Sequence, residues 1–337
     1  MIGVHNGTFH LDDTLSCFML KLLPEYKNHQ VVRTRDKMLL SKCDVVVDVG
    51  FVYDPSIHRY DHHHETFNEK FSKQYTTKLC GAGLIFKHFG LRVLSEIVET
   101  EITEENKDNF NFLLHKIYRD FVEGIDGYDN RISRFDSMEE PKYCIVNSLP
   151  NRIKRLNPGW TVSKRDDEEM MVRFNKALQL AGSEFVEFVK HVWDTWIPAY
   201  PIVLRSIKKS LEINPLTRVV ELESGCPWLE HLLYVEEQLN LKGRFQFVVF
   251  LSEFAKQLGE KWIAKAIPIS NNSQLINRTD FPEKWCGLEV SDLRKITQIQ
   301  DAHFCHKSGF LAVSRTKKGI YQMTEKALKL KKKQIEN

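Results

Sequence analysis

The chain has 337 residues with 42% hydrophobic and 11% aromatic content, which is ordinary for a globular protein and leaves room for two domains. A net charge of +3 excludes a general polycation, so a nucleic-acid partner would need a local basic surface. No apolar stretch approaches the roughly 20 residues that a membrane-spanning helix requires, and we expect no membrane partner.

The first 150 residues alternate short strands with helices. Residues 2–4 are predicted as a strand and residues 12–23 as a helix with one apolar face. Residues 44–50 form a short apolar run that ends in glycine, which is typical of a strand buried on both faces of a parallel sheet. Residues 76–91 and 109–125 are predicted helices. This alternation indicates an α/β domain.

The character of the chain changes after residue 150. Residues 151–198 read as a helical connector, with a turn at 156–160 and a long amphipathic helix over 166–193 that could bridge two lobes. From Tyr200 onward the pattern is typical of β-structure, and residues 324–333 form a Lys-rich helix or tail. The strands expected in this part are 201–204, 219–222, 245–250 and 262–267.

Three groups of imidazoles and carboxylates each follow a predicted strand or turn in the first domain. They are His5, His10 and Asp12 in the first group, Asp48 in the second, and Asp61, His62 and His63 in the third. Ligands of open α/β sheets bind outside the carboxyl ends of the strands, so we expect these side chains to converge. A ligand set without thiolates favours Mn²⁺ or Mg²⁺ over a structural zinc ion.

The number of candidate ligands is large enough for two ions. Two cations about 3.5–4 Å apart can activate water and hold both oxygens of an in-line displacement. Asp48 is our candidate for the carboxylate shared between them. Asp126 and Asp129 end a predicted helix and add two further carboxylates, although acidic residues also close helices without any function.

Each of these features has a structural interpretation as well. A single strand-end aspartate is usually structural, and the run from His62 to His64 could be a solvated loop or an adventitious metal binder. Their joint occurrence at strand ends favours a functional site.

The stretches that carry these residues resemble the DHH phosphoesterase superfamily, which includes RecJ-type exonucleases and family II inorganic pyrophosphatases. More closely, the chain resembles the melanocyte-proliferating-gene exonuclease family, also described as metal-dependent protein hydrolases. The resemblance runs from Ile2 to about Gly319. The matching stretches are HNGTFHLDDTLSCFMLKLLPEY, VVRTRD, CDVVVDVGFVYDP, HRYDHHHETF, TTKLCGAGLIFKHFG, FVEGIDGYDN, NRIKRLNPGW, CPWLEHL, FPEKWCGLE and FCHKSGF.

The resemblance implies a 3′-5′ exonuclease that acts on RNA with two divalent ions and works in the nucleus, including the nucleolus, and in the mitochondrion. It implies a doubly wound, mostly parallel DHH-type catalytic domain over 1–150 and an α/β substrate-binding domain with a Lys-rich tail over 199–337, separated by a cleft. The metal ligands by motif are His5, His10, Asp12, Asp48 and His62, with Asp126 or Asp129 as the last.

The roles in chemistry and substrate binding are assigned on the same motifs. We expect Asp48, Asp61 and His63 to be catalytic, with His63 stabilising charge on the phosphoryl oxygens. We expect substrate contacts from two sets of residues. These are Asn6, Asn130 and Arg152 in the first part of the chain, and the turn of His306, Lys307, Ser308 and Gly309 near its end. On composition alone, this last turn reads equally well as an ordinary β-turn with solvated lysines.

Two departures from the family pattern stand out. The first motif usually reads H-C-D-E, whereas here Leu11 and Asp13 replace its second and fourth residues, and metal preference could differ. A glycine pair usually follows the Ser-Gly-Phe turn, but Leu311 stands there instead. A close backbone approach to substrate is less expected at that point.

Other classes of function stay open at this stage. The same chemistry could act on pyrophosphate or short nucleotides, or the site could stabilise a non-catalytic binding module. Seven cysteines without a C-x-x-C pair favour reduced thiols in an intracellular protein, and the N-terminus resembles no presequence. The Lys-rich tail could be a solvated face, an RNA contact or a nuclear address. No obligatory protein partner is evident, and the oligomeric state is not predicted.

Overall fold

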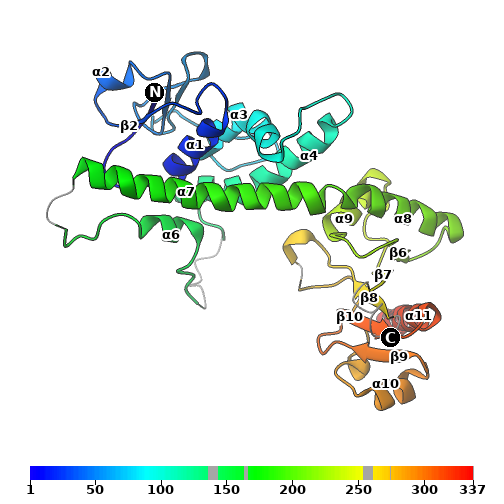
Figure 1. The fold of residues 1–337 in the computed structure, drawn as a ribbon. Coiled ribbons are helices and arrows are strands. Elements are labelled where there is room, and N and C mark those ends of the chain that lie inside the picture. The colour runs from blue at the N-terminus through cyan, green and yellow to red at the C-terminus, as the bar shows by residue number, and fades with distance from the viewer. Residues whose placement is uncertain (136–142, 163–165, 253–260, 274, 337) are drawn as a thin grey trace. The chain divides into compact units, whose positions relative to one another are not determined.

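The computed structural model describes residues 1–135, 143–162, 166–252, 261–273 and 275–336. The chain forms two compact units, Met1–Asp194 and Thr195–Asn337. Each unit packs helices on one five-stranded sheet (Figure 1). We describe each unit by itself.

The sheet of the first unit has the order β2-β1-β3-β5-β4. Its strands are β1 (Ile2–Val4), β2 (Val31–Arg33), β3 (Val45–Val47), β4 (Tyr53–Asp54) and β5 (Arg59–Tyr60). β2, β1, β3 and β5 run parallel to one another, and β4 at the edge runs antiparallel to β5. Because neighbouring parallel strands end at the same side of a sheet, the carboxyl ends of β1, β3 and β5 lie next to one another.

Helices cover both faces of this sheet. The helices of this unit are α1 (Leu11–Leu22), α2 (Lys37–Leu40), α3 (Gly81–Val98), α4 (Lys107–Ile117), α5 (Glu123–Asp129), α6 (Leu149–Lys154) and α7 (Asp167–His191). α1 packs on β3, and α3 packs on α1 and β5. On the opposite face, Leu40 of α2 packs against Val46 of β3. The mostly parallel, doubly wound α/β fold of this part is therefore confirmed.

The predicted connector contributes α6 and α7 to the first unit. α7 packs along α1 and also contacts α3, α4 and α6. The helices approach closely because Gly182 of α7 faces Phe18 of α1. A Cβ atom added at Gly182 would lie 2.1 Å from the Phe18 ring.

The second unit has a mixed sheet of order β6-β7-β8-β10-β9. Its strands are β6 (Val219–Glu221), β7 (Phe247–Leu251), β8 (Trp262–Ala266), β9 (Ala302–Cys305) and β10 (Leu311–Ser314). β6 and β7 are parallel, whereas the remaining pairs are antiparallel. Its helices are α8 (Ala199–Ile213), α9 (Leu229–Gln238), α10 (Val290–Thr297) and α11 (Lys317–Glu336).

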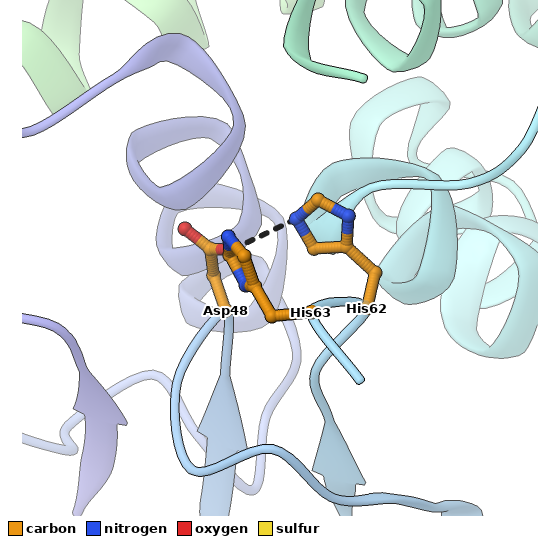
Figure 2. Close-up of side chains that lie close together, drawn as sticks. All are labelled: Asp48, His62 and His63. Atoms are coloured by element: carbon orange, nitrogen blue, oxygen red, sulfur yellow. Dashed lines mark hydrogen bonds and ion pairs between the residues drawn. The ribbon is translucent and has the colours of Figure 1, made fainter. Parts of the chain in front are cut away.

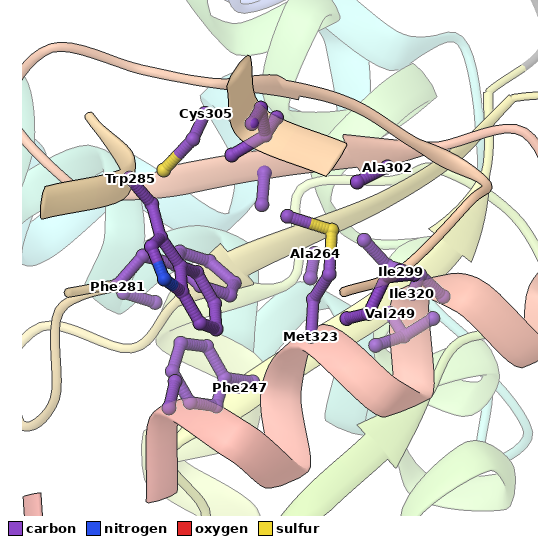
Figure 3. Packing of buried hydrophobic residues seen from close by; sticks show 14 of the residues in the cluster. Phe247, Val249, Ala264, Phe281, Trp285, Ile299, Ala302, Cys305, Ile320 and Met323 are labelled. Atoms are coloured by element: carbon purple, nitrogen blue, oxygen red, sulfur yellow. The ribbon is translucent and has the colours of Figure 1, made fainter. Parts of the chain in front are cut away.

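The alternating residues of β7 separate two hydrophobic cores in this unit. Phe247 and Val249 face a core that includes Trp285 and Met323, which Figure 3 shows from close by. Val248 and Phe250 face a second core with residues of α8 and α9, among them Ile207. The period-two alternation of a half-buried strand thus places α11 on one face and α8 with α9 on the other.

Several predicted elements need correction. Residues 201–204 form part of α8 instead of a strand, because Val203, Ser206, Ile207 and Ser210 are buried at helical spacing. α3 begins at Gly81, five residues after the predicted start at 76, since Cys80 is its N-cap.

In the described part of the chain, no helix is both long and apolar enough to cross a membrane.

Candidate metal centre

The ends of three neighbouring strands deliver the candidate ligands. His5 directly follows β1, Asp48 directly follows β3, and the run Asp61-His62-His63 directly follows β5. The register pairs Ile2 with Val45 across β1 and β3, and Val47 with Tyr60 across β3 and β5. The convergence predicted from the sequence therefore follows from the parallel register.

Asp48 lies at the centre of this convergence. Its side chain is 3% exposed and contacts imidazoles on two sides. Oδ2 lies 3.3 Å from His5 Nε2, while Oδ1 lies 3.1 Å from His62 Nε2 and 3.5 Å from His63 Nδ1. Figure 2 shows Asp48 between strand ends with His62 and His63 beside it. Both oxygens of one buried carboxylate are thus engaged by different groups.

The backbone at Asp48 turns sharply to make this position possible. Asp48 has a φ of 57°, in the left-handed region that aspartate tolerates better than most residues. The turn is held because the Asp48 N–H donates to the Tyr60 carbonyl at 3.1 Å.

A further group adds His10, Asp12 and Asp129. One ligand atom of each lies within 4.8 Å of the others. Asp12 belongs to the first turn of α1, and Asp129 is the last residue of α5. His62 joins this group to Asp48, because its Nε2 also lies 3.3 Å from Asp129 Oδ2.

Asp13 belongs to the cluster although the sequence did not single it out as a ligand. Its Oδ1 accepts the His10 N–H at 2.9 Å as part of a capping box, and its Oδ2 lies 3.0 Å from His5 Nε2. With His5 and Asp48 it forms a group that could hold an ion. The capping-box spacing from His10 to Asp13 was the signal available in the sequence.

The charges of the cluster suit divalent cations. Asp12 is 1% exposed, and among the residues that the structure describes neither of its carboxylate oxygens has a hydrogen-bond partner. Burial, with added repulsion from Asp48 and Asp129, raises the pKa of Asp12 well above its usual range. Burial and the charge of Asp48 likewise raise the pKa of Asp129. A buried carboxylate without partners is costly, and a bound divalent cation would remove that cost.

For His5, the same surroundings favour the charged form, in contrast to Asp12 and Asp129. Burial lowers the pKa of His5, but hydrogen bonds and charges from Asp13 and Asp48 outweigh it and raise that pKa to about 10. Burial would raise the pKa of Asp48, yet His5 and His62 hold it well below its usual range. The arrangement therefore stabilises positive charge next to Asp48, which is what a metal site requires.

Asp61 holds two neighbouring residues of the site, Phe51 and His63, through hydrogen bonds. Its Oδ2 accepts the Phe51 N–H at 2.6 Å, and its Oδ1 accepts the His63 N–H at 3.1 Å and pairs with His63 Nδ1 at 2.7 Å. The hydrogen bond to Asp61 raises the pKa of His63, whose side chain is 51% exposed. Asp61 thus orients His63 and the turn after Asp48.

The structure separates the two candidates for the last ligand. The Asp126 side chain is fully buried and accepts from the Cys80 N–H at 2.8 Å and from the Tyr118 hydroxyl at 3.0 Å. It joins none of the three groups around Asp48, His5 and His10. Of the two aspartates, Asp129 is therefore the one that lies in the cluster, whereas both oxygens of Asp126 are engaged elsewhere.

A cavity of about 1070 Å³ opens over the cluster. Asn6 and Asn130 line it as expected, and the Asn130 side chain donates to the Lys78 carbonyl at 2.9 Å. Arg152 does not line this cavity, because it pairs with Glu184 at 2.6 Å. The lining also contains cations and aromatic residues that the sequence did not single out. These are Arg35, Lys78, Arg131, Lys154, Phe51 and Tyr128.

The turn from His306 to Gly309 connects β9 and β10 in the second unit. His306 Nδ1 lies 2.9 Å from Ser308 Oγ and accepts the Ser308 N–H at 3.1 Å. Gly309 has a φ of 72°, which explains the glycine at this position. Its expected contact with substrate stays a prediction.

Comparisons with known proteins place the chain in a family. The MYG1 exonuclease family model, described as "Uncharacterised protein family (UPF0160)", matches residues 1–328. The MYG1 exonuclease of Bos taurus is 38% identical over 333 residues, covering 97% of this chain and 84% of the relative. The MYG1 protein C27H6.8 of Caenorhabditis elegans is 36% identical over 336 residues, covering 98% and 95%.

Two solved structures are more distant. A pGpG-specific phosphodiesterase from Vibrio cholerae is 11% identical with a TM-score of 0.26, covering 97% of this chain and 96% of its own. RecJ from Thermus thermophilus in complex with Mn²⁺ is 12% identical with a TM-score of 0.23, covering 97% and 52%. TM-scores this low do not establish a shared fold. The family model and the two relatives, in contrast, show that this chain belongs to the MYG1 exonuclease family.

Proposed function

We propose that the chain is a metal-dependent phosphodiesterase, and more specifically an exonuclease that removes nucleotides from the 3′ end of RNA. The observation that carries the proposal is the position of Asp48. One oxygen of its buried carboxylate faces His5 and the other faces His62 and His63. A carboxylate shared between two cations needs two differently engaged oxygens of this kind.

The residues present fit two divalent ions, Mn²⁺ or Mg²⁺. Asp48 would be shared, and the ligands around it would come from His5, His10, Asp12, Asp13, His62 and Asp129. When bound, such a pair supplies an activated water and positive charge next to the attacking and leaving oxygens. The unpartnered oxygens of Asp12 support this assignment, because they are buried and otherwise uncompensated.

We assign the direct action on the substrate to His63. Its Nδ1 is engaged by Asp61, and its half-exposed ring stands at the wall of the cavity. A carboxylate behind an imidazole fixes the ring orientation and supports its positive charge. We assign His63 the role of donating a hydrogen bond to a phosphoryl oxygen as negative charge develops there.

Three parts of the proposal rest on the family resemblance: that the substrate is a polymer, that it is RNA, and that cleavage proceeds from the 3′ end. The Bos taurus relative is named an exonuclease, which supports a polymeric substrate for this chain as well. The RNA preference and the 3′-5′ direction come from the motifs alone. We likewise propose the nucleus and the mitochondrion as its compartments, to be checked by imaging the tagged full-length chain.

The test uses RNA and DNA labelled at either end, with Mn²⁺, Mg²⁺ or EDTA. We expect metal-dependent release of nucleotides from the 3′ end of RNA. Asp48→Asn and His62→Ala proteins should lose at least about 100-fold in rate, because each removes a metal ligand. The matched control is Asp108→Asn, which changes an exposed aspartate in α4 and should retain full activity.

The possible outcomes separate the candidate functions. Wild-type rates in both ligand variants would overturn the metal mechanism. Hydrolysis of pyrophosphate or dinucleotides without attack on longer strands would replace the exonuclease with a small-substrate phosphohydrolase. Bound Mn²⁺ without hydrolysis of any of these substrates would leave a non-catalytic binding module.

A further inference from the structure

Two aromatic side chains stand exposed in the wall of the metal-site cavity. Phe51 is 66% exposed and Tyr128 is 54% exposed, and both line the cavity. They flank the cluster from different elements. The Phe51 ring lies edge-on to His63 with 6.4 Å between ring centroids, and Tyr128 immediately precedes Asp129 at the end of α5. Neither ring is buried in a core.

The backbone under Phe51 is held in an unfavourable conformation. Phe51 has a φ of 60°, where a bulky residue is a genuine outlier. Its N–H donates to the buried Asp61 Oδ2 at 2.6 Å, which fixes this conformation. Arg131, another cavity residue, has a φ of 56°. Strained backbone of this kind is often found at ligand sites, where the surrounding structure offsets its energetic cost.

The lining of this cavity also carries positive charge. Arg35, Lys78, Arg131 and Lys154 come from four separate segments and line the cavity. Among the residues that the structure describes, none of these four forms an ion pair with a carboxylate, and the Lys78 ammonium lies over the Phe67 ring at 5.3 Å. Among the carboxylates that line the cavity, Asp12, Asp48 and Asp129 belong to the metal cluster, and Asp61 pairs with His63. The side chains around it therefore present cations to an anionic ligand.

We propose that this cavity binds single-stranded nucleic acid over at least two successive nucleotides, with bases stacked on Phe51 and Tyr128. The four cations contact the phosphates on either side of the one that faces the metals. This inference rests on the proposed function and adds to it how the substrate is held. Exposed rings beside a basic groove are the arrangement that binds single strands without sequence preference. A small substrate such as pyrophosphate would have no use for either ring.

The experiment compares an oligonucleotide with a substrate that has no bases. Initial rates are measured on single-stranded RNA and on bis-p-nitrophenyl phosphate with Mn²⁺. Stacking of one base is worth about 1–3 kcal/mol, so Tyr128→Ala and Phe51→Gly should each raise the KM for RNA roughly 5- to 150-fold. Phe51→Gly also relieves the left-handed backbone, so its thermal stability should be retained or improved. Tyr128→Phe should restore the wild-type KM.

Controls and charge variants sharpen the comparison. Trp160→Ala removes an aromatic residue that is 92% exposed in the same unit and does not line the cavity, and its KM should stay unchanged. Lys78→Gln and Arg131→Gln should each reduce the slope of log affinity against log salt by about 0.7, as expected when one phosphate contact to a single strand is lost.

The outcomes distinguish this inference from the function on which it rests. Wild-type hydrolysis of both substrates with unchanged KM for RNA in the ring variants would overturn the stacking role and leave the phosphodiesterase intact. If the wild-type protein hydrolyses neither substrate, the proposed function fails. Fluorescence anisotropy with a labelled oligonucleotide then still tests the inference, and equal affinity of wild-type, Tyr128→Ala and Phe51→Gly proteins would overturn it.

Discussion

Asp126 and Asp129 lie three residues apart in α5 and have different surroundings. Asp129 reaches the cluster around His62, whereas Asp126 is enclosed by the Cys80 N–H and the Tyr118 hydroxyl. On a helix, positions i and i+3 lie on similar faces, so the sequence could not choose between them. The choice was made by α3, whose N-terminal turn covers Asp126 but leaves Asp129 open to the cavity.

Asp126 should make stability depend on pH. Burial raises its pKa to about 7, despite hydrogen bonds from Cys80 and Tyr118 that lower it. Because an unfolded aspartate titrates near about 4, the folded state holds more protons between about pH 4 and pH 7. The free energy of unfolding should therefore fall as pH rises through this window, by on the order of 4 kcal/mol in total.

Asp126→Asn tests this directly, because an amide can hydrogen-bond both partners and cannot ionise. We expect the variant to match the wild type near pH 4 and to become more stable than the wild type by pH 8. Urea unfolding across this pH range measures the difference. A constant difference between the two proteins at all pH values would show that Asp126 does not titrate in this window.

At the scale of elements, the close packing of α3, α5 and the chain between α4 and α5 sets the shape of the site. Residues 118–122 form a π-helical turn that continues α4 into α5 and aims the Tyr118 hydroxyl at Asp126. Opposite this carboxylate stands Gly83 of α3. A Cβ atom there would lie 2.2 Å from Asp126 Oδ1, so α3 can reach this position only with glycine.

Gly83→Ala should destabilise the protein. The clash involves a buried carboxylate that is held on two sides, and overpacking of this kind costs about 1–3 kcal/mol. In a domain of this size, each kcal/mol lowers the melting temperature by roughly 2–4 °C. Thermal unfolding followed by circular dichroism measures the loss.

Gly124→Ala is the matched control for this prediction. A Cβ atom added to Gly124 of α5 meets nothing within 4 Å. Alanine is favoured over glycine inside a helix, so this variant should be unchanged or slightly stabilised. Equal losses in both variants would contradict a specific clash at Asp126, because helix propensity favours alanine at both positions.

At the scale of the whole molecule, the metal cluster links segments that are far apart in the sequence. Its residues come from the ends of β1, β3 and β5, from the start of α1 and from the end of α5. Every one of these elements belongs to the unit Met1–Asp194. Repulsion among these carboxylates opposes folding of this unit until a cation binds.

Metal addition should therefore stabilise the protein. Ions that bind only the folded state add about 2.7 kcal/mol at a concentration 100 times their dissociation constant. We expect Mn²⁺ to raise the melting temperature of the wild type and of Asp108→Asn, and EDTA to reverse the change. In Asp48→Asn the shift should be largely lost. A full shift in Asp48→Asn would place the bound ion elsewhere.

The βα alternation of the first unit and the positions of His5, Asp48 and His62 after their strands could be predicted from the amino-acid sequence. These could be predicted because strand-end positions depend on local hydrophobic runs, which are visible in one sequence. The helical start of the second unit at Pro201–Leu204 was mistaken for a strand, since four apolar residues fit either period.

The packing of the folded chain was needed to see which carboxylates face one another. It brought Asp13 to His5, enclosed Asp126 away from the cluster, and gathered Phe51 and Tyr128 with the cations in the lining of one cavity. These relations depend on how α3 and α5 pack and on a left-handed turn held by Asp61. Contacts between distant segments are set by side-chain packing in three dimensions, and one sequence carries no local signal for them.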